Sequence, residues 1–132
     1  MTDGFWSWLA GFYEGEGSCG CYTNGRKGNK YRLMVSISQK DPRVLDYIKQ
    51  SLERGSVTKN KTTYGVIHAW RVCSANARWF LNQIRPHMRT PLKISQVDAA
   101  LSKDKNLVGP RHTRRDSTTG RLIARAKCQL LN

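Results

Sequence analysis

The stretch WLAGFYEGEGS at residues 8–18 constrains this chain more than any other. Thr2 or Asp3 can cap a helix that runs from about Gly4 to Glu14, and Gly15 or Gly17 can end it. Glu14 and Glu16 then lie at the C-terminal end of the helix, where the helix dipole disfavours carboxylates. Their position therefore needs a structural or chemical reason.

The charge of the chain is strongly unbalanced. Its 132 residues include 23 Lys and Arg but 9 Asp and Glu, which gives a net charge of +14. Two long stretches, residues 17–40 and 54–97, contain basic residues and no acidic ones. Neutralising phosphates releases counterions, so this surface predicts nucleic acid as the partner. A ribosomal-type structural protein, a protein on an anionic membrane and a solvated surface of random sign are the alternatives.

The cysteines do not form a metal or disulfide framework. Cys19 and Cys21 make a lone C-x-C, and Cys73 and Cys128 are isolated, so no second pair completes a zinc site. We expect reduced thiols in strands and an intracellular protein. The sequence shows no signal peptide and no apolar run long enough to span a bilayer, and no membrane partner is expected.

Hydrophobic periodicity predicts an α+β fold. Helices are expected to begin near Gly4, after Asp41, and after Ser74 or Asn76 as the capping residue, and a further helix is expected at about 91–101. The expected strands are residues 18–24, 31–39, 56–60 and 66–73. This α-β-β-α-β-β-α order predicts an antiparallel sheet with helices on one face and a polar, basic face exposed. We expect a core domain over residues 1–102 and a basic C-terminal extension over residues 103–132.

The first helix predicts a second helix against it. On a helical wheel the aromatic residues cover one broad face, and the opposite side carries small residues, among them Ser7, Ala10 and Gly11. Small residues allow close helix approach. Because no second copy of this pattern follows in the chain, the partner helix would come from another subunit in a two-fold homodimer. Burial of the helix within its own domain is the alternative.

A two-fold pair of such helices would bring four carboxylates close to one axis. A hard divalent cation relieves that repulsion, and oxygen ligands suit Mg²⁺, Mn²⁺ or Ca²⁺. A carboxylate–metal centre beside a basic sheet is the arrangement of a phosphodiesterase that acts on nucleic acid. Simple neutralisation of nearby lysines by Glu14 and Glu16 is the alternative.

At these residues the chain resembles a known family. LAGFYEGEG, residues 9–17, closely resembles the signature of the LAGLIDADG homing endonucleases, in their single-motif, homodimeric form. The resemblance runs through about residues 5–100: RLMVSISQKDPRVLDYIKQSL resembles the second strand and its helix, RGSVTKNK the third strand, and HAWRVCSANARWFLNQIRPHM the fourth strand and its helix. It implies the saddle-shaped antiparallel sheet of that family.

The resemblance also implies roles for individual residues. Glu16 takes the second acidic position, which ligates the metal at the scissile phosphate, and the carbonyl of Gly17 can help complete the site. Gln39 matches a residue that orients water, and Arg43 matches a basic position in the water network. Lys93, in a K-x-x-Q pattern, resembles the active-site lysine. Residues expected at the dimer interface are Ser7, Ala10, Gly11 and Glu14, the last in the structural first acidic place.

The exposed sheet face is expected to contact DNA in the major groove, where Arg pairs with guanine and Asn with adenine. The candidate contacts are Ser18, Tyr22, Asn24, Arg26, Lys30, Arg32, Met34, Ser36, Ser38, Ser56, Thr58, Asn60, Lys61 and Arg71. Lys61 is expected at the phosphate backbone.

The implied function is site-specific cleavage of double-stranded DNA by an intron-encoded homing endonuclease. It would hydrolyse phosphodiester bonds with Mg²⁺ as a homodimer on a long pseudo-palindromic site, in the cytoplasm of a bacterial or phage host or in an organelle matrix. An intron maturase with host intron RNA as partner, or a non-cleaving DNA- or RNA-binding protein on the same fold, is the alternative. A basic structural RNA-binding protein is a third class.

Overall fold

The computed structural model describes residues 1–23 and 31–104. Its elements follow one another as α1 (Asp3–Glu16), β1 (Gly17–Thr23), β2 (Tyr31–Gln39), α2 (Pro42–Leu52), β3 (Ser56–Thr62), β4 (Gly65–Cys73), α3 (Ser74–Ile84) and the short 3₁₀ helix η1 (Arg85–His87). A further helix covers residues 91–104. This order confirms the predicted α+β fold.

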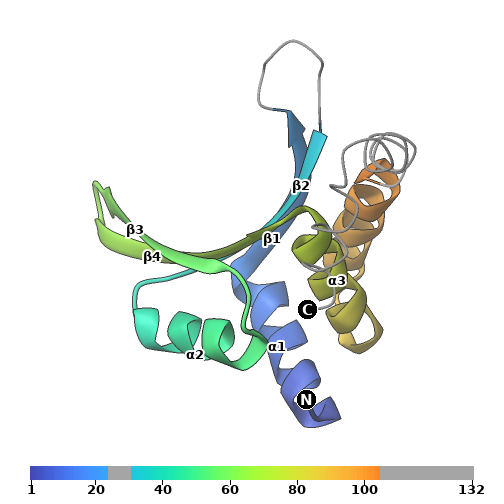
Figure 1. Cartoon of the computed structure of the whole chain (residues 1–132), viewed down its shortest axis with the longest axis horizontal. Coiled ribbons are helices and arrows are strands. Elements are labelled where there is room, and N and C mark those ends of the chain that lie inside the picture. Colours follow the sequence, from blue (N-terminus) through green and yellow to red (C-terminus); the bar gives the residue numbers. More distant parts are fainter. Residues whose placement is uncertain (24–30, 105–132) are drawn as a thin grey trace, which may run out of the picture.

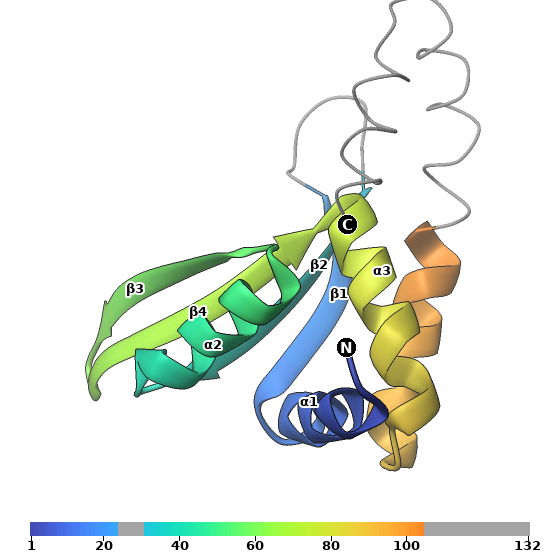
Figure 2. The same ribbon diagram turned by 60° about the horizontal axis from the view of Figure 1, so that its bottom comes forward.

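The four strands form one antiparallel sheet in the order β1-β2-β4-β3. The helices lie against one face of it, and the sheet curves so that its helix-free face is concave (Figures 1 and 2). In β2 the residues Leu33, Val35 and Ile37 are buried and alternate with more exposed ones, as the period of two predicts. The core therefore lies between the helices and the sheet face that they cover.

The starts of two helices follow the predicted capping chemistry. The Thr2 side chain accepts a hydrogen bond from the Phe5 N–H, and Asp41 accepts one from the Arg43 N–H with Pro42 in the first turn. The prediction for α3 was wrong. That helix already begins at Ser74, which has a positive φ of 55°, and Cys73 at its N-cap makes no side-chain capping bond.

The helix over residues 91–104 lies beside α3 in both views (Figures 1 and 2). It continues past the domain boundary predicted at residue 102, and Asp104 is buried with an ion pair to Arg78 at 2.6 Å. The rest of the predicted basic extension lies outside the described residues. Within those residues, no helix is long and apolar enough to cross a membrane.

Candidate active site and nucleic-acid interface

The junction of α1 and β1 holds Glu16 at a fixed place. Glu16 is the last residue of α1 and is exposed, and Gly17 begins β1 and is buried. A Cβ on Gly17 would lie 2.3 Å from Cδ1 of Tyr13, so only glycine allows the strand to pass this ring. The Tyr13 side chain is fully buried, and burial, with the nearby Cys19 thiol, raises the pKa of its hydroxyl. The carboxylate of Glu16 therefore projects from a rigid base.

Lys93 lies beside this junction. It comes from the helix over residues 91–104, and its Nζ donates a hydrogen bond to the Gly17 carbonyl at 2.5 Å. The same ammonium lies 5.8 Å from the centre of the Tyr13 ring. The structure thus brings the predicted lysine next to the residue that follows Glu16. Its catalytic role stays a prediction.

Gln39 lies at the same end of the sheet. Gly17 pairs with Ile37 across β1 and β2, and Gln39 is the last residue of β2, two positions further on. It shares a sheet face with Ile37 and pairs with His68 of β4, whose Nδ1 is 3.0 Å from the Lys40 carbonyl oxygen. His68 is a neighbour that sequence reasoning did not place here, because only the strand register reveals it.

Arg43 makes a contact that the sequence did not predict. Its guanidinium donates to both oxygens of Asp41, at distances between 2.6 and 3.0 Å. These hydrogen bonds lower the pKa of Asp41 to about 2. Arg43 is therefore engaged at the start of α2, and its place in a water network stays a prediction.

One member of the predicted dimer-interface set, Ala10, needs correction, and the other three stay predictions. Ala10 is fully buried in its own subunit, so a partner cannot reach it. Glu14 accepts hydrogen bonds from the main-chain N–H groups of Arg89 and Thr90, and Ser7 Oγ lies 3.1 Å from His87 Nδ1. Three of the four side chains thus contact their own subunit, and Gly11 alone is exposed without such a contact within the described residues.

The exposed face of α1 agrees with the predicted small-residue face at Ser7 and Gly11 and differs from it at Ala10. The buried residues Trp6, Leu9, Ala10 and Tyr13 follow the i, i+3, i+4, i+7 pattern of a single stripe. Trp8, one of the aromatic residues of the predicted broad face, is 40% exposed. Across from the stripe lie Gly11 and Gly15, and a Cβ built on either would meet nothing within 4 Å. This face is open to a partner helix.

The helix-free sheet face carries most of the predicted DNA contacts. Strand register places ten of them on that one face: Ser18, Tyr22, Arg32, Met34, Ser36, Ser38, Ser56, Thr58, Asn60 and Arg71. Lys61 pairs with Val66, which puts it on the face that carries Val57 and the core, and its expected contact with the phosphate backbone stays a prediction. Asn24, Arg26 and Lys30 lie outside the described residues.

Most side chains of this face are neutral. Among its described residues Arg32 and Arg71 supply the positive charge, and Arg71 pairs across the sheet with Ser36 on one side and Ser56 on the other. The tip of the β3–β4 hairpin adds Tyr64, which is 88% exposed and was not predicted as a contact. The sequence feature that could have indicated this exposed side chain is an aromatic residue directly before Gly65 in a turn.

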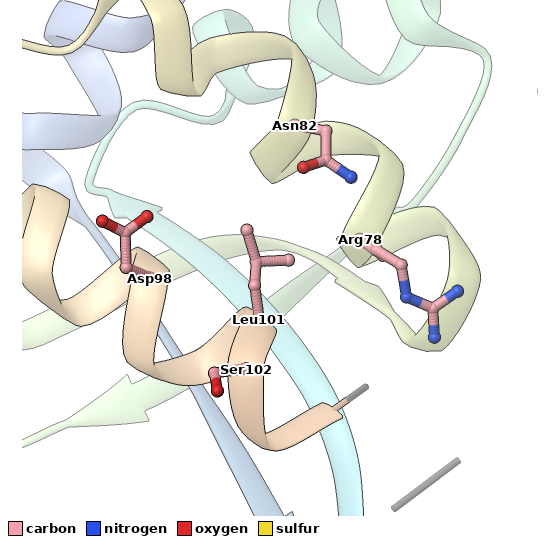
Figure 3. Close-up of a pocket in the computed structure, with 5 residues that line it drawn as sticks. All are labelled: Arg78, Asn82, Asp98, Leu101 and Ser102. Carbon is pink, nitrogen blue, oxygen red and sulfur yellow. The ribbon is translucent and has the colours of Figure 1, made fainter. Parts of the chain in front are cut away.

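A groove of about 340 Å³ lies elsewhere, between α3 and the helix over residues 91–104. It is lined by Arg78, Asn82, Asp98, Leu101 and Ser102 (Figure 3). Arg78 is paired with Asp104, and Asp98 with Arg85. Because none of the predicted site residues lines this groove, it is separate from the Glu16–Lys93 site.

A model of the LAGLIDADG endonuclease family matches residues 9–90, which is more than half of the chain. The chain belongs to the LAGLIDADG endonuclease family. The matched region includes Glu16 and Gln39, but it ends before Lys93. A comparison with curated proteins found no match.

Solved structures of LAGLIDADG endonucleases have the same fold. The archaeal intron-encoded homing endonuclease I-Vdi141I, solved with DNA, is 24% identical with a TM-score of 0.68, over 84% of this chain and 73% of that one. The homing endonuclease I-CvuI, solved with its target and Ca, is 22% identical with a TM-score of 0.66, over 81% of this chain and 69% of that one. I-CeuI, encoded by a group I intron and solved with DNA, is 15% identical with a TM-score of 0.68, over 85% and 59%.

The oxygen donors of this LAGLIDADG chain suit a hard cation that also binds phosphate oxygens and water. Within the described residues no three His, Cys, Asp or Glu side chains gather into a closed metal site. Glu16 offers an exposed carboxylate, and Gly17 a carbonyl with one hydrogen bond from Lys93. Mg²⁺ commonly binds through one or two carboxylates and completes its shell with water and phosphate oxygens. This donor set fits such an ion.

Proposed function

We propose that this chain is a site-specific endonuclease that hydrolyses phosphodiester bonds in double-stranded DNA with a divalent metal ion. The observation that carries the proposal is the contact of Lys93 Nζ with the Gly17 carbonyl at 2.5 Å, next to the exposed Glu16. An ammonium and a carboxylate beside a polar, concave sheet face are suited to phosphate chemistry. The family and the DNA complexes of its structural neighbours support the same function.

Each side chain then has a definite task. Glu16, with the Gly17 carbonyl, would hold the metal ion, which when bound supplies a Lewis acid and a more acidic water. Lys93 would place its positive charge near the scissile phosphate, where negative charge develops during hydrolysis. Gln39, at the same edge of the sheet, would orient water by hydrogen bonds. The concave face would hold the duplex, with Arg71 and Arg32 reaching bases or phosphates.

We also propose that the active form is a homodimer on a long pseudo-palindromic site, with each subunit cutting one strand. The exposed face of α1 around Gly11 and Gly15 supports this, because its glycines would let a second α1 approach closely. Trp8 and Phe12 stack at 5.7 Å beside it and supply apolar surface. Glu16 follows at the end of the same helix, so such a dimer brings two copies of it near one axis.

An intron-encoded origin and a place of action inside the cell belong to the same proposal. The described cysteines are free thiols, as a reducing compartment requires. Maturase activity, with host intron RNA as partner, is the other function that this fold would allow. It predicts binding without DNA cleavage.

The decisive experiment is selection of cleaved sites from a randomised DNA library with Mg²⁺. We expect recovered sites with two related half-sites. Glu16→Gln protein should lose cleavage by roughly a hundredfold or more, since it loses a charged metal ligand, and it should still bind the selected site in Ca²⁺. Equal Mg²⁺-dependent cleavage by the Glu16→Gln protein would refute the metal role, and no cleavage by the unmodified protein would favour the non-cleaving binder.

A further inference from the structure

The carboxylate of Glu14 holds the start of the helix over residues 91–104. Its Oε2 accepts hydrogen bonds from the main-chain N–H groups of Arg89 at 2.9 Å and Thr90 at 2.5 Å. The Thr90 carbonyl accepts the first helical hydrogen bond, from the Ile94 N–H at 3.0 Å. The N–H groups at a helix start lack helical partners, and the helix dipole favours negative charge there. Glu14 therefore binds the two N–H groups directly before the first helical residue, at 91.

The same helix carries Lys93, three residues after Thr90. Lys93 reaches back to the Gly17 carbonyl, three residues after Glu14. Two short segments, residues 14–17 and 90–93, are thus joined twice, once through the main chain at Thr90 and once through the Lys93 side chain. Because a helical turn is rigid, a shift of Thr90 is passed to Lys93 with little loss.

Other contacts hold the remainder of the helix. Cys19 Sγ lies 3.8 Å from the Gln96 carbonyl oxygen, and Cys21 Sγ lies 3.5 Å from that of Ala100. Asp98 pairs with Arg85 at 2.9 Å. All of these contacts come after Lys93 in the chain. Loss of the Glu14 contact should therefore loosen the first turn and leave the helix docked.

We propose that Glu14 is a positioning residue for Lys93: its carboxylate fixes where the helix begins and so holds Lys93 Nζ at the Gly17 carbonyl beside Glu16. The inference rests on the proposed nuclease function, in which Lys93 acts on the phosphate. The two glutamates of the EGEG segment then serve one site in different ways, since Glu16 binds the metal and Glu14 aligns the lysine.

A double-mutant cycle tests this inference. Glu14→Ala, Lys93→Met and the double variant are compared in single-turnover cleavage of the selected site with Mg²⁺, and in binding of that site with Ca²⁺. Glu14→Ala should lower the cleavage rate constant roughly tenfold to a hundredfold, the effect expected when a reacting group is misplaced by about 1 Å. Glu14→Gln, which keeps one oxygen acceptor, should fall in between. DNA binding should stay unchanged.

The Lys93→Met background decides the mechanism. If Glu14 acts through Lys93, Glu14→Ala causes no further loss there. The same fold-loss in both backgrounds, or no loss in either, would overturn the inference. Asp98→Asn is the matched control, because it removes a carboxylate contact of the same helix after Lys93, and it should leave the rate constant unchanged.

A second measurement does not depend on cleavage. Amide hydrogen exchange followed by mass spectrometry should show faster exchange in Glu14→Ala protein, confined to residues 89–96. Unchanged exchange there would overturn the anchoring role. If the unmodified protein cleaves no DNA, the proposed function and the catalytic part of the inference fail together, and the exchange result still decides whether Glu14 anchors the helix.

Discussion

At the scale of single residues, the EGEG segment meets a different physical requirement at each position. Glu14 is half-buried and accepts two main-chain hydrogen bonds, whereas Glu16 is exposed. Gly15 leaves an open helix surface, and Gly17 allows the chain to pass the buried ring of Tyr13. Two acids that look equivalent in the sequence therefore face different surroundings.

The close approach at Gly17 can be tested by one methyl group. Gly17→Ala places a Cβ 2.3 Å from Cδ1 of Tyr13, a ring that the core holds fixed. We expect the free energy of unfolding to fall by roughly 1–3 kcal/mol, as for other overpacked sites, in urea denaturation. Gly4→Ala is the control, because its Cβ would lie at an ordinary 3.8 Å from Thr2 Oγ1. Equal stability of the two variants would contradict the packing described for Tyr13.

The Asp41–Arg43 pair predicts a defined pH dependence. The pKa of Asp41 is about 2 in the folded chain, below its ordinary value of 3.8. A lowered pKa stabilises the fold above the unfolded value, and that contribution is lost as the pH falls from about 4 to about 2. Asp41→Asn keeps a capping side chain but cannot titrate, so its stability should fall less over this window. Thermal unfolding measured as a function of pH checks this, with Asp46→Asn of α2 as the control variant. Equal losses of stability in Asp41→Asn and the unmodified protein between about pH 4 and pH 2 would contradict it.

At the scale of elements, the sheet sorts its residues by face. The pairings of β2 with β1 and β4, and of β4 with β3, align Ser36, Arg71 and Ser56 on the concave side. Val57 and Trp70 pair on the other side, where the helices cover them. A basic residue can thus contribute to the concave face or lie behind it, depending on one step in register.

Substitutions of Arg71 and Lys61 test which face of the sheet contacts DNA. Arg71→Ala should weaken binding of the selected site in Ca²⁺ by about 1–3 kcal/mol if Arg71 reads a base, with relaxed specificity at one position. Lys61→Ala should have a smaller effect and leave specificity unchanged, because Lys61 lies on the other face. Competition binding with altered half-sites measures both. A larger loss of affinity for Lys61→Ala would show that the sheet binds DNA by its other face.

The sequence predicts strands better than it predicts the surroundings of α1. The bounds of β2 agree with the predicted 31–39, because alternation of Leu33, Val35 and Ile37 is a local signal. The exposed face of α1 is predicted only in part, since Trp8 is as apolar as Trp6 and packing against Trp79 of α3 distinguishes them. The partners of Glu14 are equally invisible, because 75 and 76 residues separate them in the chain.

At the scale of the whole molecule, the described part of the chain has a complete core and leaves the face of α1 around Gly11 uncovered. Glu16 ends that helix with an exposed carboxylate. In the proposed homodimer, association of two subunits would cover this face and bring two copies of Glu16 near one axis.

The dimer can be separated from the fold with one substitution. Gly11→Leu adds a side chain where nothing lies within 4 Å, so the subunit should stay folded. In sedimentation at micromolar concentration it should be monomeric where the unmodified protein is dimeric, and it should lose double-strand cleavage by roughly a hundredfold, as expected when helix contact is blocked. Asn82→Leu, at an exposed position of α3, is the control. Dimeric Gly11→Leu protein that still cuts both strands would disprove this interface.

The contact between Lys93 and Gly17 can form only late in the synthesis of the chain. The two residues are 76 positions apart, and all four strands lie between them. A domain generally folds as a unit during synthesis, and the helix that carries Lys93 also supplies Val97 and Ala100 to the core. A nascent chain therefore holds every strand and Glu16 well before it can complete its core. A product that ends near residue 90 would lack both the ammonium and this part of the core, so under the proposed function it should not cut DNA.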